Sequence, residues 1–310
     1  MAGENSKKSG EIGETLASSL LEMIGWTPFM RNVSIECNTP AHVNGKGNPR
    51  QTHGEDQVYL YHTPFHDETT YVVHVSDKNT KKYPDSSKLL KDFKSHLLEL
   101  FQTIECAKHN PKINEICSYF GTRRNTNHLG LLIWLHNDLE DIQKTILTQT
   151  KIARPNIANR EPIYLIDNAR ATFVYNVVKS LMSKGGHYEF FYPQIGTVTT
   201  VYEPRTGKSL PLELLVSGVI PAVVKKDGVR ELIIYTNEVY SPESYMNLLD
   251  YGLSFCVGLV DSIQIGMKNY NPSKDEESAQ QVRFAYQDRP EKVTPFCVED
   301  SILSLINGDR

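Results

Sequence analysis

The stretch 54–79 constrains the fold of this chain most, because it contains two β-strand patterns separated by a turn. β-Branched and aromatic residues fill 58–61 and 71–75, and the polar residues 66–68 lie between them. Runs of this kind, bounded by turn residues, are typical of paired strands. The sequence therefore predicts two neighbouring strands in one sheet.

Charged residues mark the ends of these two predicted strands. Asp56 opens the first strand and Lys78 ends the second. Because strand side chains alternate between faces, His74, Ser76 and Lys78 share one face and Asp77 points to the other. A carboxylate can hold a divalent metal ion, and a lysine can neutralise or position a phosphate. The pattern indicates a phosphodiesterase-like site, with an ordinary surface hairpin as the alternative.

Two helices are predicted on either side of this hairpin. The first begins near residue 10 with an apolar face that stops at 25–26, and Glu11 and Glu14 lie in its first turn. Those glutamates fit either a favourable interaction with the helix dipole or a carboxylate beside an active site. The second helix covers 86–108, with Asp85 or the following serine as its cap.

Basic residues gather around the second helix and before the next apolar strand at 128–135. Solvated lysines are one explanation, and contact with a DNA backbone is the other. The predicted DNA-contacting residues are Lys81, Lys82, Lys88, Lys91, Arg123 and Arg124.

The order of elements is helix, strand, strand pair, helix, strand, helix, which predicts an α/β sandwich over about the first 150 residues. A polar loop at 38–53 precedes Asp56 and fits a functional loop or an insertion. The histidines in this region show no regular ligand spacing, so we expect them to be solvated, with at most one near phosphate: His42, His53, His62 and His66.

This order of elements, with Asp56 at a strand mouth and Lys78 on its neighbour, resembles the PD-(D/E)XK restriction-endonuclease-like superfamily. The closer likeness is to its Mrr-like branch, in which the first helix supplies a glutamate. The resemblance implies a mixed-sheet nuclease domain in which Asp56 binds Mg²⁺ or Mn²⁺ and Lys78 is the catalytic lysine. Glu14 or Glu11 matches the helix glutamate.

One departure concerns the acid expected two residues before the lysine, where this chain has Ser76. A hydroxyl is a poorer ligand than a carboxylate. The resemblance allows a replacement from the later helix, Asp92 or Glu99, or Asp77 if a bulge turns it to the other face. The predicted catalytic residues are Asp56, Ser76, Lys78 and Glu14, and the predicted metal ligands are Asp56, Glu14 and Glu99.

The resemblance implies a Mg²⁺-dependent DNA endonuclease, within a prokaryotic restriction or anti-phage defence system. The alternative is a catalytically inactive DNA-binding or scaffold subunit with the same fold. A weaker third hypothesis is a sensing module at Asp167, where Asn168 and Arg170 also fit a ligand site. An N-cap is the commoner reason for such residues.

The second half, 154–310, is expected to be a separate α/β domain after an endonuclease-like domain at 1–153. Segments 162–167, 169–182 and 188–192 read as a strand–helix–strand unit, and 225–228 as a hairpin turn. The helix predicted at 240–251 carries an apolar stripe that fits either an interface or a core face. We therefore expect a homo-oligomer or a second subunit; the stripe consists of Tyr240, Tyr245, Leu248, Leu249 and Tyr251.

Composition restricts the setting of the protein. The net charge is −4, so affinity for DNA must come from a local patch. No apolar run approaches the ~20 residues of a membrane span, and no secretory signal is apparent. The five cysteines are odd in number and form no C-x-x-C pair, which predicts a reducing, cytoplasmic setting without a zinc site or disulfides.

Overall fold

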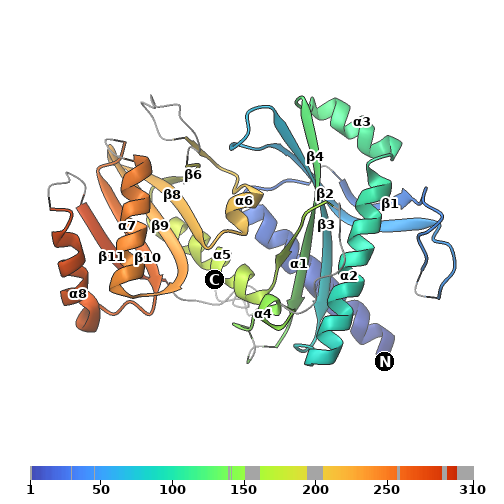
Figure 1. Cartoon of the computed structure of the whole chain (residues 1–310), viewed down its shortest axis with the longest axis horizontal. Helices are drawn as coiled ribbons and strands as arrows, with labels where there is room; N and C mark the ends of the chain where they lie inside the picture. The colour runs from blue at the N-terminus through green and yellow to red at the C-terminus, as the bar shows by residue number, and fades with distance from the viewer. Residues whose placement is uncertain are drawn as a thin grey trace. The chain divides into compact units, whose positions relative to one another are not determined.

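The computed structural model describes residues 2–28, 30–44, 46–138, 140, 142–150, 161–193, 205–256, 259–287 and 292–298. The chain forms two compact units (Figure 1). The first contains residues 1–22 and 26–171, and the second contains 23–25 and 172–310. Within the described residues, no helix is both long and apolar enough to cross a membrane.

The first unit is built on a five-stranded mixed sheet in the order β1-β2-β3-β4-β5. The first three strands are antiparallel neighbours, and β3, β4 and β5 run parallel. This is the mixed α/β architecture that the sequence predicted. The strands are β1 (Met30–Glu36), β2 (Thr52–His62), β3 (Thr69–Thr80), β4 (Asn125–His136) and β5 (Ile163–Ile166).

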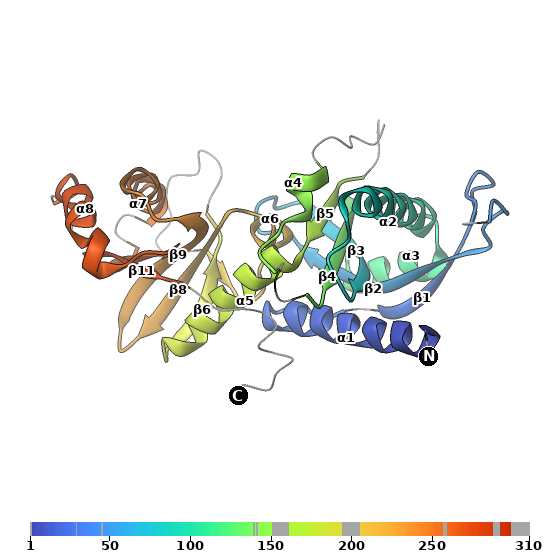
Figure 2. The same ribbon diagram turned by 90° about the horizontal axis from the view of Figure 1, so that it is seen from below.

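Two long helices cover opposite faces of this sheet (Figure 2). The first is α1 (Ala2–Met23) and the second is α2 (Ser86–Ala107), whose N-cap Asp85 accepts a hydrogen bond from the backbone N–H of Lys88. The apolar stripe of α2 packs on Leu132 and Trp134 of β4. Two shorter helices, α3 (Pro111–Phe120) and α4 (Ile146–Thr150), complete the unit, and α3 is an element that we did not predict.

The boundary expected between 153 and 154 differs from the division at 171 and 172. The reason is β5, which pairs in parallel with β4 and so belongs to the first sheet. The predicted strand, helix and strand are all present, but they do not form one unit within a single sheet. The first of these strands lies in the first sheet, while β6 (His187–Phe191) pairs antiparallel with β8 (Val219–Lys226) in the second sheet.

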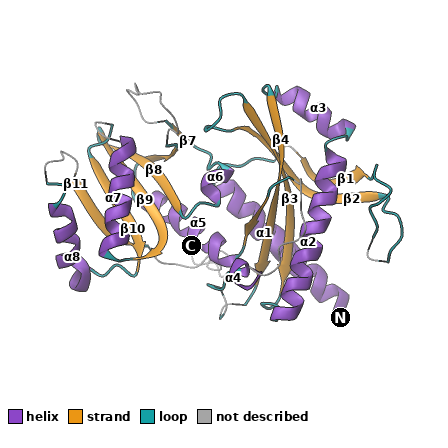
Figure 3. Cartoon of the chain, viewed as in Figure 1, coloured by secondary structure: helices purple, strands orange, loops and turns teal. Residues whose placement is uncertain are grey.

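The second unit contains a six-stranded sheet in the order β11-β10-β9-β8-β6-β7. Figure 3 shows its strands in orange. β9 (Val229–Val239), β10 (Ser262–Lys268) and β11 (Lys292–Cys297) are parallel, and the two-residue β7 (Thr206–Gly207) lies at the edge. The predicted hairpin turn is confirmed, because β8 and β9 are joined at Asp227 and Gly228, both with positive φ. The helices are α5 (Asn168–Ser183), α6 (Leu212–Leu215), α7 (Pro242–Cys256) and α8 (Pro272–Phe284).

The apolar stripe of α7 is part of the core. Tyr245 and Leu249 are fully buried, and Leu248 is nearly so. Tyr240 and Tyr251 are half-buried and pack against the same cluster, which includes strand residues of β9 and β10. The core interpretation of this stripe is therefore confirmed. Residues 154–160, just after the expected domain boundary, and residues 301–306 lie outside the described residues.

Candidate active site

Asp56 and Asp77 meet where β2 and β3 separate. The backbone N–H of Asp77 donates to Oδ2 of Asp56 at 2.7 Å. Nε2 of Gln57 donates to Oδ2 of Asp77 at 3.0 Å and to Oγ of Ser18, on α1, at 3.3 Å. The Asp77 side chain therefore lies on the face of the sheet that α1 covers.

A change of side-chain alternation in β2 explains this geometry. Val58 lies directly opposite His74 and shares its face. Glu55 hydrogen-bonds to the same His74, so Glu55 and Val58 are on one face although three positions apart. On β1, Asn32 falls opposite this point and has a φ of 51°. The irregularity at 56–57 directs Asp56 toward the backbone of Asp77.

The electrostatics around Asp77 are those of a cation site. Burial raises the pKa of its carboxyl to about 7, and the negative charges of Asp56 and Glu14 act in the same direction. Gln57 and Lys78 act the other way. Oδ1 of Asp77 is buried and has no hydrogen-bond partner among the described residues. A divalent cation would satisfy this oxygen and offset the repulsion between the three carboxylates.

Glu14 reaches this region because α1 approaches β3 closely at Gly13. A Cβ atom at Gly13 would lie 2.3 Å from Cβ of Asn79, a distance that two carbon atoms cannot adopt. Asn79 lies two residues after Asp77 and therefore on the same face. Glu14 itself is exposed. The three carboxylates do not form a tight cluster of ligand atoms within the described part of the chain, so a bound metal ion would have to draw Glu14 inward.

Lys78 belongs to the other face of the sheet. Its Nζ lies 3.3 Å from Oε2 of Glu99 on α2, and Nη1 of Arg50 lies 3.5 Å from the other Glu99 oxygen. Burial acts to raise the pKa of Glu99, but Lys78 and Arg50 outweigh it and lower the pKa. Ser76 shares the Lys78 face by strand alternation.

The structure thus divides the predicted site residues into two sets. Asp56 and Glu14 lie with Asp77, whereas Ser76, Lys78 and Glu99 lie toward α2. The condition set for Asp77, a bulge that turns it to the other face, is not met, because β3 pairs with β4 from Thr69 to Thr80 without a register shift. Asp77 stays on the α1 face, and it is Asp56 that comes to it. On the α1 face, the positions of the acid and of the residue two places later are therefore occupied by Asp77 and Asn79. The side chain of Glu11 lies outside the described residues.

The predicted DNA-contacting residues fall into two groups at opposite ends of β3. Lys81, Lys82, Lys88 and Lys91 are exposed and lie after the end of β3 and at the start of α2. Arg123 and Arg124 precede β4, whose first residue pairs with the first residue of β3. β3 spans 12 residues, so at ~3.3 Å per residue the groups are separated by ~36 Å. Only the lysine group lies at the end of β3 that carries Asp77.

Asp167 and Asn168 stabilise backbone groups. Oδ1 of Asp167 accepts from the N–H of Arg170 in the first turn of α5, and Oδ2 accepts from the N–H of Ile146. The Asn168 side chain bonds to both backbone groups of His136. The N-cap interpretation is confirmed.

The expectation of solvated histidines is wrong for two of the four. His42 and His53 are buried, with exposed fractions of 5% and 0%. Burial lowers the pKa of His53 to about 4. His62 is partly exposed and bonds to Thr70, and His66 is exposed. Sequence reasoning missed the first two because their neighbours come from distant segments.

Comparison with known protein families assigns this chain to a family. Residues 1–170 of the 310 match the family model described as the GAPS4 protein PD-(D/E)XK nuclease domain. The chain belongs to the GAPS4 PD-(D/E)XK nuclease family. A comparison with curated proteins gives no match. The match confirms the predicted superfamily for the N-terminal half, and membership of the Mrr-like branch stays a prediction.

Membership of the GAPS4 family implies general properties of the nuclease domain. GAPS4 is an anti-phage defence family, so the chain has a nuclease-type domain of a defence protein. PD-(D/E)XK nucleases act on DNA and generally use divalent metal ions such as Mg²⁺. The carboxylates on the α1 face suit such an ion, because oxygen ligands are those that Mg²⁺ prefers.

Proposed function

We propose that this GAPS4 chain is a Mg²⁺-dependent DNA endonuclease with its site on the α1 face of the first sheet. The observation that carries the proposal is the meeting of Asp56 and Asp77, with Glu14 near enough to raise the pKa of Asp77. Asp56, Asp77 and Glu14 would hold the metal ion. When bound, such an ion lowers the pKa of a coordinated water and stabilises the negative charge of the attacked phosphate.

The surrounding residues position these acids. Gln57 holds one oxygen of Asp77, and Tyr59 donates from its hydroxyl to Oε1 of Gln57 at 2.6 Å, which fixes the amide orientation. The backbone N–H of Asp77 holds Asp56. One oxygen of each acid is thereby fixed, and Oδ1 of Asp77 is left for a cation.

The residue at the position of the motif lysine supports a second hypothesis. Asn79 stands two residues after Asp77, where the motif of the superfamily has its lysine. An amide can orient a water or phosphate but cannot supply a positive charge. The presence of Asn79 where the superfamily has a lysine favours the alternative that the chain binds DNA without cleaving it. The earlier prediction that Lys78 is catalytic stays open, and Lys78 would have to exchange its contact with Glu99 for one with DNA.

Plasmid nicking tests the proposal. The purified chain should convert supercoiled plasmid to the nicked form with Mg²⁺ or Mn²⁺, alone or with the proteins encoded beside it. Asp56→Ala and Asp77→Asn should each reduce the rate at least about 100-fold, since each removes a proposed metal ligand. Glu22→Gln is the matched control, because Glu22 is on α1 but pairs with Arg31 at the surface.

Two outcomes separate the hypotheses. Cleavage that survives Asp77→Asn but disappears in Lys78→Ala would place the site on the α2 face and overturn the proposal. DNA binding without cleavage under all metal conditions would support the inactive subunit.

We also propose that the lysine group beyond β3 contacts the DNA backbone. Each phosphate contact that is lost lowers the salt dependence of binding by about one unit. A double Lys81→Gln, Lys82→Gln variant should therefore reduce the slope of log K against log salt by about two. Arg123→Gln with Arg124→Gln is the comparison, and a larger loss there would assign the footprint to the other end of the sheet.

Assembly is proposed on mechanistic grounds. One nuclease site cuts one strand, and a double-strand break needs two sites, supplied by a homo-oligomer or a second subunit. Light scattering of the full chain, alone and with the neighbouring gene products, tests this. A monomer under both conditions contradicts it.

A further inference from the structure

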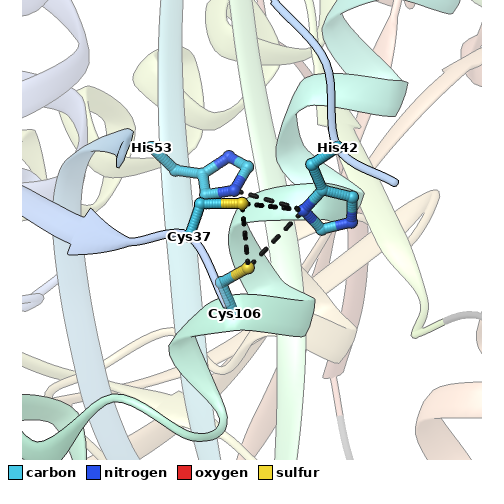
Figure 4. A group of neighbouring side chains, drawn as sticks. All are labelled: Cys37, His42, His53 and Cys106. Carbon is cyan, nitrogen blue, oxygen red and sulfur yellow. Dashed lines mark hydrogen bonds between the residues drawn. The ribbon is translucent and has the colours of Figure 1, made fainter. Parts of the chain in front are cut away.

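Two cysteines and two histidines converge in the first unit, away from the carboxylates described above. We propose that Cys37, His42, His53 and Cys106 form a structural zinc site. Cys37 follows β1, His42 lies in the β1–β2 loop, His53 is in β2, and Cys106 is in the last turn of α2 (Figure 4). Their ligand atoms all lie within 4.8 Å of one another.

The spacing of these atoms is that of a tetrahedral zinc shell. Zn–S bonds of ~2.3 Å and Zn–N bonds of ~2.0–2.1 Å place ligand atoms ~3.8 Å apart for S–S, ~3.6 Å for S–N and ~3.3 Å for N–N. The two sulfurs are 3.9 Å apart, and Nδ1 of His42 lies 3.5 Å from each sulfur. Nδ1 of His42 lies 3.3 Å from Nε2 of His53. These four of the six separations match the expected values, and the two between His53 and the sulfurs are within 4.8 Å.

Hydrogen bonding alone does not account for the group. Nδ1 of His42 faces three donor or acceptor atoms at once, whereas one ring nitrogen can donate or accept only one such bond well. Three of the four side chains are buried, and Cys37 is partly buried. A cation at the centre would satisfy all four atoms together, because thiolates and neutral imidazoles are its natural ligands.

The outer contacts also fit a metal site. Nε2 of His42, the nitrogen away from the cluster, lies 3.2 Å from a carboxylate oxygen of Glu105. A carboxylate behind a metal-bound imidazole fixes the ring orientation and raises its basicity. Two sulfurs and two nitrogens in tetrahedral arrangement select Zn²⁺ among common metals. Because the protein supplies all four ligands, the site has no open position for catalysis and is structural.

The zinc ion would tie the β1–β2 loop to the end of α2. The loop closes on itself through bonds from the N–H of Cys37 to the carbonyl of Gln51 and from the N–H of Arg50 to the carbonyl of His42. Arg50, from the same loop, reaches Glu99. The prediction of no zinc site rested on the lack of paired cysteine motifs. It missed this group because the fourth ligand is on α2, far along the chain.

Metal analysis of the purified full chain tests the proposal. Wild-type protein kept under reducing conditions should contain about one zinc ion per chain by plasma mass spectrometry. Cys37→Ser and Cys106→Ser should each lose most of the metal, and Cys117→Ser, at a half-buried cysteine on α3 outside the group, should retain it. Replacement by Co²⁺ should give the visible absorption of a tetrahedral site and a sulfur charge-transfer band.

The wild-type measurements keep the test decisive if a variant does not fold. A metal-free wild-type chain that takes up neither Zn²⁺ nor Co²⁺ after dialysis would overturn the proposal. So would a disulfide between Cys37 and Cys106 that persists in protein purified under these reducing conditions, or iron in place of zinc. Loss of nuclease activity plays no part in these readouts, so this proposal and the endonuclease proposal fail independently.

Discussion

Asp77→Asn is the substitution that tests the electrostatics of the site most directly. Asparagine has the shape of aspartate, and its amide oxygen can still accept from Gln57. The change removes the cost of ionising a buried carboxyl beside two others. We therefore expect the variant to be inactive and, without divalent metal, more stable than the wild type at alkaline pH.

The magnitude follows from the pKa of Asp77. Burial, with the charges of Asp56 and Glu14, raises it from 3.8 to about 7. At about 1.36 kcal/mol per pKa unit this shift corresponds to about 4 kcal/mol, and relaxation of the surroundings reduces the expected gain to about 2 kcal/mol. The protonated form stabilises the fold below pH 4, and this stabilisation is lost as the pH rises through 7.

Thermal unfolding, followed by circular dichroism in buffer without added divalent metal, measures the effect. The Tm of Asp77→Asn should exceed that of wild type by about 4–8 °C at pH 8, and the difference should approach zero near pH 4. Added Mg²⁺ should raise the Tm of wild type only. A variant less stable than wild type at pH 8, or a difference independent of pH, would refute the reasoning.

Three further variants test other parts of the structure. Gly13→Ala should destabilise the first unit by about 1–3 kcal/mol and reduce cleavage, because its methyl group displaces α1 from Asn79; unchanged Tm and rate would contradict the close approach. Asp167→Ala should cost about 1–2 kcal/mol in denaturant unfolding through loss of the α5 cap, and a neutral result would contradict the cap. Lys81→Gln with Lys82→Gln should weaken DNA binding at low salt, measured by fluorescence anisotropy, more than at high salt.

Much of the first domain follows from local sequence patterns. Alternation at 58–61 and 71–75 predicted β2 and β3, and the 3.6-residue period predicted α2 with Asp85 as its cap. The order of these elements, with Asp56 at a strand mouth and Lys78 on its neighbour, gave the resemblance to the superfamily that the family match confirms. α3 was missed because it is short and buries only Ile113.

The face of the sheet on which each proposed site residue lies could not be determined in this way. Strand alternation predicts which residues share a face of the sheet, but not which helix covers that face. A single irregularity also exchanges the faces of all residues beyond it. The change of phase at 56–57 brings Asp77 beside Asp56, and Lys78 is left to pair with Glu99. Likewise β5 is a readable strand, yet only tertiary pairing shows which sheet it joins.

The proposed zinc ligands show most clearly the difference between what the sequence determines and what the tertiary structure determines. The sequence determined that Cys37, His42, His53 and Cys106 exist and lie in or beside β1, β2 and α2. Their convergence depends on how α2 packs across β1 and β2, which is a matter of long-range contact between elements that local periodicity does not encode. The tertiary structure alone therefore decided that four scattered side chains form one tetrahedral group.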